Sequence, residues 1–259
     1  MTVKNELAAL LIELDASKAK LDALRPLPPA AVRNLHDELV LRWTYNSNAI
    51  EGNTLTLMET KVVLEGITVG GKLLREHFEA INHRDAILYV EEIARREEPF
   101  SEWQIRNLHR LILKQIDDEN AGTYRKLNVT IAGARHIPPD MLQVPEQMVA
   151  LLRWYEQSQY DTEAHALHPI ERAAKLHLDF VKIHPFIDGN GRTARLLLNL
   201  ELIKSGFPAI VLPVERRLAY YEALDTACVD GDLAPFVALV AECVKEGFKP
   251  YWFMLGMPQ

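Results

Sequence analysis

The stretch HPFIDGNGRTAR at residues 184–195 combines several residue types that act in binding and catalysis, and the rest of the chain is interpreted in relation to it. It has a histidine that can accept a proton, His184, and a carboxylate, Asp188, followed by the turn Gly189-Asn190-Gly191. Glycines ahead of a helical run let backbone N–H groups approach a ligand, and the helix dipole behind them favours an anion. The stretch therefore predicts an anion site that suits phosphates, with a base beside it.

Two arginines and the carboxylate extend this interpretation. Arg192 and Arg195 are three residues apart, so both can project from one helical face toward the same anion. Asp188 suits Mg²⁺, which commonly uses one or two carboxylates plus substrate oxygens. With an ordinary pKa of about 6.5, His184 can accept a proton near neutral pH. Each residue alone has a structural explanation, but the set indicates proton removal from a nucleophile beside a metal-bound polyphosphate.

The composition narrows the classes of protein. The chain has 259 residues and a net charge of −7, which argues against a general nucleic-acid binder. It has two cysteines, Cys228 and Cys243, so a disulfide framework and a thiolate zinc site are both disfavoured. Acidic residues interrupt the apolar N-terminus and no apolar run is long enough to span a membrane. We expect a cytoplasmic protein that binds neither a membrane nor nucleic acid directly.

Hydrophobic spacing predicts a mainly α-helical fold. Apolar residues recur at helical intervals, and Thr56-x-x-Glu59 and Ser101-x-x-Gln104 are capping-box signatures at helix starts. Pro169 suits the first position of a helix. The expected helices cover residues 3–24, 30–50, a short segment after 56, 73–98, a segment after 101, 144–155, 170–183, 191–204, 215–228 and 233–245.

One segment departs from the helical pattern. Residues 128–131 and 135–137 are short β-prone runs around Ala132-Gly133, which favours a β-hairpin. The absence of alternating strands and helices argues against a doubly wound sheet. The predicted architecture is thus helical with one hairpin, divided into an N-terminal helical region at 1–99 and a core with C-terminal helices at 100–259.

The motif at 184–195 resembles the signature of the Fic family, H-P-F-x-[D/E]-G-N-G-R-x-x-R, with every fixed position filled. The resemblance extends to residues 100–246 and includes a hairpin flap over the active site. It implies transfer of a nucleoside monophosphate, usually AMP from ATP, to a protein hydroxyl. Sister Doc-type sequences, which transfer a phosphoryl group, have Ala and Lys where this chain has Gly189 and Gly191. The two glycines therefore favour nucleotidyl transfer.

The resemblance also assigns roles to the residues of the motif. His184 would deprotonate a target Ser, Thr or Tyr, and Asp188 would hold Mg²⁺ on the α- and β-phosphates. Arg195 would bind the γ-phosphate. The residues expected to cradle the phosphates are Gly189, Asn190, Gly191 and Arg192.

A second stretch, Ser47-Asn48-Ala49-Ile50-Glu51-Gly52, is similar to the inhibitory motif [S/T]-x-x-x-E-[G/N] of autoinhibited Fic proteins. Taken alone, it is a helix C-terminus with a glycine stop. The resemblance assigns Ser47, Glu51 and Gly52 a regulatory role, in which Glu51 pairs with Arg195 and removes the partner of the γ-phosphate. Relatives with this glutamate can also remove AMP from their targets, so de-AMPylation is a further expectation.

Two other segments are expected to contact the substrates. Tyr221, in the pair Tyr220-Tyr221, resembles a family tyrosine beside the nucleotide base, although core packing explains the pair equally well. Some relatives have an adenine-contacting Asn shortly afterwards that this chain lacks, which leaves UTP, GTP and CDP-choline as alternative donors to ATP. Val129, Thr130 and Ile131 of the expected flap would align an extended target segment, and an ordinary surface hairpin is the other interpretation.

Three alternatives stay open at this stage. The first is a metal-dependent hydrolase that uses His165, His168, His177 and His184, although no H-E-x-x-H pattern is present. The second is a nucleotide-binding regulatory or interaction protein without transfer activity, and the third is a toxin restrained by a separate antitoxin. Automodification is expected of a transferase, and the resemblance allows a homodimer that no residue in the sequence demonstrates.

Overall fold

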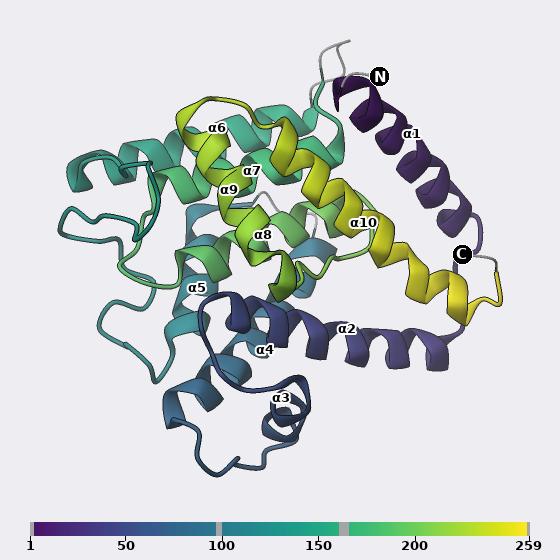
Figure 1. Cartoon of the computed structure of the whole chain (residues 1–259), viewed down its shortest axis with the longest axis horizontal. Coiled ribbons are helices and arrows are strands. Elements are labelled where there is room, and N and C mark those ends of the chain that lie inside the picture. The colour runs from purple at the N-terminus through teal and green to yellow at the C-terminus, as the bar shows by residue number, and fades with distance from the viewer. Residues whose placement is uncertain (1–2, 97–99, 161–165, 258–259) are drawn as a thin grey trace.

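The computed structural model describes residues 3–96, 100–160 and 166–257, and these form a helical protein (Figure 1). The sequence prediction of a mainly α-helical fold is confirmed, and no strand occurs in the described residues. The helices are α1 (Val3–Asp22), α2 (Pro29–Ile50), α3 (Leu57–Leu64), α4 (Leu74–Arg95), α5 (Glu102–Leu113), α6 (Val144–Tyr160), α7 (Pro169–Ile183), α8 (Asn190–Lys204), α9 (Arg217–Val229) and α10 (Ala234–Met254). Short 3₁₀ turns, η1 (Met141–Gln143) and η2 (Val214–Arg216), precede α6 and α9.

Helix α8 lies at the centre of the molecule, with α7, α4, α5 and α2 packed against it (Figure 1). Its residues are buried on nearly every side, which is typical of a helix surrounded by others. One side of α8 adds Leu196 and Leu197 to a core shared with α2, α4, α5, α6 and α7. The other side adds Leu198 and Leu202 to a core shared with α1, α7, α9 and α10. The helix that follows the glycine turn is therefore held rigidly between two cores.

A buried carboxylate fixes the far end of α8. Glu201 is fully buried and accepts hydrogen bonds from the Tyr155 hydroxyl at 2.6 Å, from Arg172 Nε at 2.8 Å and from the Ser205 hydroxyl at 2.7 Å. A buried charge of this kind is tolerated only when its partners satisfy it. The network therefore anchors α8 to α6 and α7 at the end opposite the predicted site.

The predicted capping box at Thr56 forms in full, and at Ser101 the half in which the backbone N–H donates to Gln104 Oε1 at 2.7 Å is present. The helix predicted over 233–245 is longer, because α10 continues through Pro250 to Met254. Trp252 in this extension is buried in the second core and lies under Lys20 of α1, at 5.1 Å from its ring centre. Tertiary packing thus outweighs the helix-breaking tendency of the proline.

The predicted β-hairpin is wrong in its secondary structure. Residues 127–139 run as loop and turn, with Ala134 N donating to Ile131 O at 3.2 Å, and no ladder joins the two flanks. Asp225 of α9 instead accepts the Arg135 backbone N–H at 2.8 Å and its side-chain Nε at 2.6 Å. Bonds from the loop to a helix have replaced the expected bonds between strands.

The predicted boundary between residues 99 and 100 adjoins residues 97–99, which lie outside the described part of the chain. The first core nevertheless contains Val40 and Ile87 from one side of this boundary and Leu108 from the other. None of the described helices is both long and apolar enough to cross a membrane.

Candidate active site

His184 ends α7 in a left-handed conformation, with φ 49° and ψ 59°. This conformation is uncommon for a residue other than glycine and is often found where a side chain is aimed for function. Two bonds hold it: His184 N donates to Phe180 O at 3.0 Å, and His184 O accepts from Arg125 Nε at 2.9 Å. Burial and the nearby Arg125 lower the pKa of His184 to about 4, so the imidazole is neutral near pH 7 and free to accept a proton.

The loop after His184 is fixed from two directions. Asn190 uses its side chain within the loop, accepting from Phe186 N at 3.0 Å and donating to Phe186 O at 2.9 Å. His109 of α5 stacks on the Phe186 ring at 3.6 Å and bonds Asp188 O at 2.8 Å. Because the Asn190 side chain is occupied in this way, its backbone N–H is the group available to a phosphate.

Sequence reasoning missed the supporting roles of His109 and Arg125. Arg125 is buried, and besides His184 O it bonds the carbonyls of Leu127 at 3.0 Å and Pro139 at 2.5 Å. Through these hydrogen bonds, Arg125 connects both ends of the loop at 127–139 to the end of α7. An isolated histidine and arginine give no signal of such contacts, since their partners are distant in sequence.

A cavity of about 530 Å³ opens between α8, α9 and the loop at 127–139. It is lined by residues that the sequence singled out for four different roles: Glu51, Ile131, His184, Asn190, Gly191, Arg195 and Tyr221. The structure therefore brings the predicted base, part of the phosphate cradle and the predicted inhibitory residue to one space. Asp188, Gly189 and Arg192 are not among the residues that line it.

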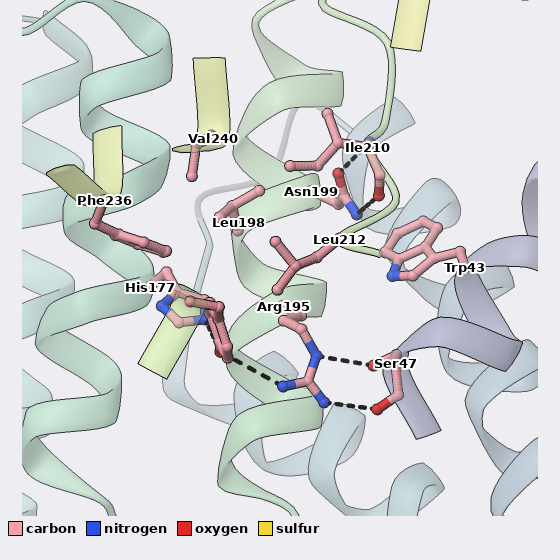
Figure 2. Close-up of a pocket in the computed structure, with 11 residues that line it drawn as sticks. Trp43, Ser47, His177, Arg195, Leu198, Asn199, Ile210, Leu212, Phe236 and Val240 are labelled. Carbon is pink, nitrogen blue, oxygen red and sulfur yellow. Dashed lines mark hydrogen bonds between the residues drawn. The ribbon is translucent and has the colours of Figure 1, made fainter. Parts of the chain in front are cut away.

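Arg195 lies at the bottom of this cavity and is almost fully buried. Its guanidinium donates to the Ser47 hydroxyl at 3.0 Å, to Ser47 O at 2.8 Å and to Glu51 Oε1 at 2.7 Å (Figure 2 shows the contacts with Ser47). Burial by itself would lower the pKa of Arg195, but the Glu51 carboxylate outweighs it and the pKa stays above its ordinary value. The pair predicted from sequence, Glu51 with Arg195, is thus in contact.

The end of α2 presents Glu51 through local backbone geometry. Gly52 has a φ of 97° and donates to Ala49 O at 3.0 Å, while Asn53 N donates to Asn48 O at 3.1 Å. These two bonds make a Schellman motif, which needs a residue with positive φ at the glycine position. Glu51 is the last residue before this stop, so the motif fixes its backbone beside α8.

Gly191 makes room for the carboxylate of Glu51. A side-chain carbon at position 191 would lie well under 3.0 Å from Glu51 Oε1 and 3.1 Å from Arg195 Nη1. The bare backbone at the start of α8 is where a glycine turn would admit a phosphate oxygen. A carboxylate of the chain itself therefore lies where the sequence predicts an anion of the substrate.

Behind Arg195, a hydrogen-bonded chain leads into the second core. Arg195 Nη1 donates to the Tyr220 hydroxyl at 3.5 Å, and this hydroxyl lies 2.9 Å from His177 Nε2. Arg195 can only donate to the Tyr220 hydroxyl, so we assign this hydroxyl as the hydrogen-bond donor to Nε2. The hydrogen of the neutral His177 ring is then on Nδ1. Nδ1 has no hydrogen-bond partner among the described residues. The His177 ring also lines a small cavity of about 20 Å³, together with Arg195 and Tyr220.

Asp188 and Arg192 form a separate cluster beside the turn. Asp188 Oδ1 accepts from Gly189 N at 2.6 Å and from Arg192 Nη2 at 3.2 Å, and Oδ2 accepts from Arg75 Nη2 of α4 at 2.8 Å. Burial raises the pKa of Asp188, but Arg192, the Gly189 N–H and Arg75 outweigh it and hold the pKa below its ordinary value. Asp188 is therefore ionised near neutral pH.

The remaining predicted residues are Tyr221 and three residues of the loop at 127–139. The Tyr221 hydroxyl donates to Ile50 O at 3.3 Å at the end of α2, and its ring is partly exposed to the cavity. Within the loop at 127–139, Thr130 is exposed, whereas Val129 and Ile131 are half-buried. The tyrosine that was expected beside a nucleotide base thus also contacts the helix that carries Glu51.

The histidines of the alternative metal site are engaged elsewhere. His168 caps α7 by accepting from Ile170 N at 3.1 Å, and His177 bonds Tyr220. His165 lies outside the described residues. Within the described ranges, no three His, Cys, Asp or Glu side chains are grouped to share a metal ion.

Comparison with known proteins identifies relatives of this site and fold. The model of the Fic/DOC family matches residues 99–202. The chain is 35% identical over 251 residues to "Protein adenylyltransferase Fic" of Drosophila grimshawi, which covers 96% of this chain and 50% of that protein. The Drosophila willistoni protein of the same name is 35% identical and covered to 49%. The chain therefore spans about half the length of the curated relatives it matches.

Solved structures agree over nearly the whole chain. Fic-1 (aa 134–508) from C. elegans superposes with a TM-score of 0.86 at 34% identity, covering 98% of this chain and 74% of that one. A Fic domain containing signaling protein from Bacteroides thetaiotaomicron superposes with a TM-score of 0.85 at 30% identity, covering 96% and 98%. From its motif, its fold and these relatives, the chain belongs to the Fic/DOC family.

Proposed function

We propose that the protein is an adenylyltransferase that transfers AMP from ATP to a Ser, Thr or Tyr hydroxyl of a target protein. The observation that carries this proposal is the shared cavity, where a neutral His184 and the start of α8 face one space. Its volume of about 530 Å³ is in the range of small-molecule sites. The Drosophila relatives named as protein adenylyltransferases support the choice of AMP.

The reaction follows from the placement of these groups. His184 takes the proton from the target hydroxyl, whose oxygen forms a bond to the α-phosphorus of ATP as the bond to the β-phosphate oxygen breaks. Backbone N–H groups of Asn190 and Gly191 at the start of α8 stabilise the phosphate charge, and pyrophosphate leaves, whereas the Gly189 N–H is engaged by Asp188 Oδ1. Arg195 pairs with the γ-phosphate once Glu51 has moved away.

The residues beside the turn suit a bound Mg²⁺. Asp188 is ionised and reaches the surface, and Mg²⁺ is commonly held by one or two carboxylates together with substrate phosphates. The donor set therefore fits this ion, with Asp188 as its protein ligand. When bound, Mg²⁺ would neutralise charge on the phosphates.

Autoinhibition by Glu51 is part of the proposal. The Glu51 carboxylate pairs with Arg195 at 2.7 Å and fills the space over Gly191, so a phosphate cannot use either group while the pair is closed. Ser47 holds the same guanidinium through two bonds and thereby aligns it with Glu51. The contact supports the regulatory roles predicted for Ser47, Glu51 and Gly52.

The same glutamate supports a second, reverse activity. Glu51 lines the cavity together with His184, so its carboxylate can orient a water toward a phosphodiester formed there. We propose that the protein can also remove AMP from a modified target. Incubating a purified AMP-modified target with the wild-type protein and with Glu51→Gln tests this, since only the wild type is expected to release AMP.

The target-binding proposal rests on the loop at 127–139. Ile131 lines the cavity and Thr130 is exposed beside it, so an extended segment of a target can pair with this backbone next to His184. Arg135→Ala would remove the side-chain bond to Asp225 and leave the backbone bond, and this loosening of the loop is expected to weaken target modification more than automodification.

Labelling with isotopically labelled nucleotides tests the transfer proposal. The Glu51→Gly protein is incubated in lysate with labelled ATP, UTP or GTP, and labelled proteins are identified by mass spectrometry. Label transferred from ATP to a protein hydroxyl supports the proposal. Label transferred from UTP or GTP would show that this nucleotide, and not ATP, is the donor. Nucleotide binding without transfer would instead support a regulatory nucleotide-binding protein.

A further inference from the structure

Two side chains of opposite charge occupy the two sides of the phosphate site. Glu51 is an anion on Arg195, where a phosphate is expected. Arg75 is a cation on Asp188, where a metal ion is expected, with Nη2 at 2.8 Å from Oδ2. The sequence motif gives no role to Arg75, which lies 113 positions from Asp188 and belongs to α4.

Local contacts hold Arg75 in this position. Its Nε donates to Glu79 Oε1 one turn later on α4, at 3.1 Å. Glu79 Oε2 in turn accepts from Asn53 Nδ2 at 2.9 Å, and Glu76 accepts from Thr54 N at 2.7 Å. The start of α4 is therefore tied to the residues that directly follow Glu51, and both charges are presented by one connected part of the chain.

The two oxygens of Asp188 differ in how they can be reached. Oδ1 is held by Gly189 N and by the buried Arg192, which belong to the turn and to α8. Oδ2 is held by Arg75 alone among the described residues. An ion that binds Oδ2 in the direction of Arg75 must therefore displace this guanidinium.

The contact is also of a kind that can be displaced. The side chains of Arg75 and Asp188 are 55% and 44% exposed, so water and salt screen their attraction. A divalent ion carries twice the charge and approaches the carboxylate more closely than a guanidinium nitrogen does. Arg75 can neutralise Asp188 in the ligand-free protein and still give way to Mg²⁺.

We propose that Arg75 is an internal counter-cation that takes the place of the divalent metal ion on Asp188 and competes with it. This inference rests on the proposed function, because it concerns the same metal-dependent site. It adds a second inhibitory contact: Glu51 blocks the place of the phosphate, and Arg75 blocks the place of the cation. Metal binding then requires that α4 release Asp188.

Titration of the nucleotide-free protein with Mn²⁺, followed by electron paramagnetic resonance of the free ion, tests this competition without measuring activity. We expect Arg75→Gln to bind Mn²⁺ roughly three- to fivefold more tightly than the wild type, as suits the loss of one exposed ion pair. Arg42→Gln is the matched control. Arg42 is also 55% exposed and pairs with a glutamate one turn away, Glu38, so the substitution changes net charge equally.

The control variants decide the outcome. Arg42→Gln is expected to match the wild type, and Arg75→Gln/Asp188→Asn is expected to lose the gain. The proposal is overturned if Arg75→Gln binds Mn²⁺ no more tightly than Arg42→Gln, or if the gain persists without the Asp188 carboxylate. It is also overturned if Arg75→Gln weakens binding, since Arg75 would then assist the ion.

The same titration separates this inference from the proposed function. If Glu51→Gly transfers no nucleotide while Arg75→Gln still gains Mn²⁺ affinity through Asp188, the transfer proposal fails and the competition stands. If Glu51→Gly transfers AMP while the Mn²⁺ affinities of wild type and Arg75→Gln are equal, the reverse holds.

Discussion

Replacing Glu51 by glycine should increase the affinity of the site for nucleotide by the free energy of the contact between Glu51 and Arg195. A charge-assisted hydrogen bond contributes about 1.5–3 kcal/mol, but the Glu51 side chain is 35% exposed, so we discount this to about 1–2 kcal/mol. An ATP analogue that must displace Glu51 from Arg195 bears this cost in the wild type only. We therefore expect Glu51→Gly to bind a non-hydrolysable ATP analogue with Mg²⁺ roughly five- to thirtyfold more tightly, measured by isothermal titration calorimetry.

The chain contains a closely matched control for this change. Glu65 ends α3 as Glu51 ends α2, with φ and ψ of −79° and 0° against −86° and 1°, and Gly66 follows with a φ of 87°. Glu65→Gly therefore reproduces the backbone effect without touching Arg195. We expect its affinity for the analogue to equal that of the wild type, and Glu51→Gln to be intermediate.

The contact between Glu51 and Arg195 should also contribute to the free energy of unfolding. Beyond the loss seen in Glu65→Gly, Glu51→Gly should lose at least about 1–2 kcal/mol more, because the nearly buried Arg195 then lacks its carboxylate partner. Equal nucleotide affinities for the wild type, Glu51→Gly and Glu65→Gly would refute the reasoning. So would a gain of similar size in Glu65→Gly.

Three further predictions concern buried titratable side chains. Since burial and Arg125 lower the pKa of His184 to about 4 and Glu51 acts to raise it, transfer by Glu51→Gly should stay constant from about pH 8 to about pH 5.5; a midpoint near 6.5 in its pH–rate profile would contradict this. Burial lowers the pKa of His83, His109 and His177 in the folded chain, so the unfolded chain binds more protons below pH 6.5. The free energy of unfolding should therefore be highest above pH 6.5 and should fall as the pH is lowered, by roughly 1 kcal/mol per histidine at about pH 5.5. A thermal unfolding midpoint that stays the same between about pH 7.5 and about pH 5.5 would contradict this prediction. Glu201→Ala removes a fully buried carboxylate and leaves the largely buried Arg172 without its counter-ion, so it should cost about 3–5 kcal/mol in urea unfolding. The exposed neighbour Glu156→Ala should cost under about 0.5 kcal/mol, and equal costs would show that the network does not anchor α8.

Much of the helical fold could be predicted because its signals are local. The capping residues Thr56 and Ser101 and the proline at 169 mark helix starts within a few positions. The end of α10 could not be predicted in this way, because Trp252 gains its burial from a core assembled by α1 and other helices. The loop at 127–139 has strand-forming residues, but its hydrogen-bond partner Asp225 lies on α9.

The candidate site was predictable to a similar extent and for the same reason. His184, Gly191 and Arg195 lie within one short stretch, so their order in the sequence nearly fixes their common position. Glu51 was found through its motif, and its contact with Arg195 is present. Arg75, His109 and Arg125 were missed because each reaches the stretch at 184–195 from a distant part of the chain. Their identities carry no sign of these contacts.

The most direct test of the transfer proposal is mass spectrometry of purified Glu51→Gly protein after incubation with ATP and Mg²⁺, beside Glu51→Gly/His184→Ala. The account predicts that Glu51→Gly gains the mass of AMP on a Ser, Thr or Tyr side chain, and that the double variant remains unmodified while it still binds the nucleotide. An unmodified Glu51→Gly protein that binds ATP, or equal modification of both variants, would contradict the assignment of His184 as the base in an adenylyl transfer.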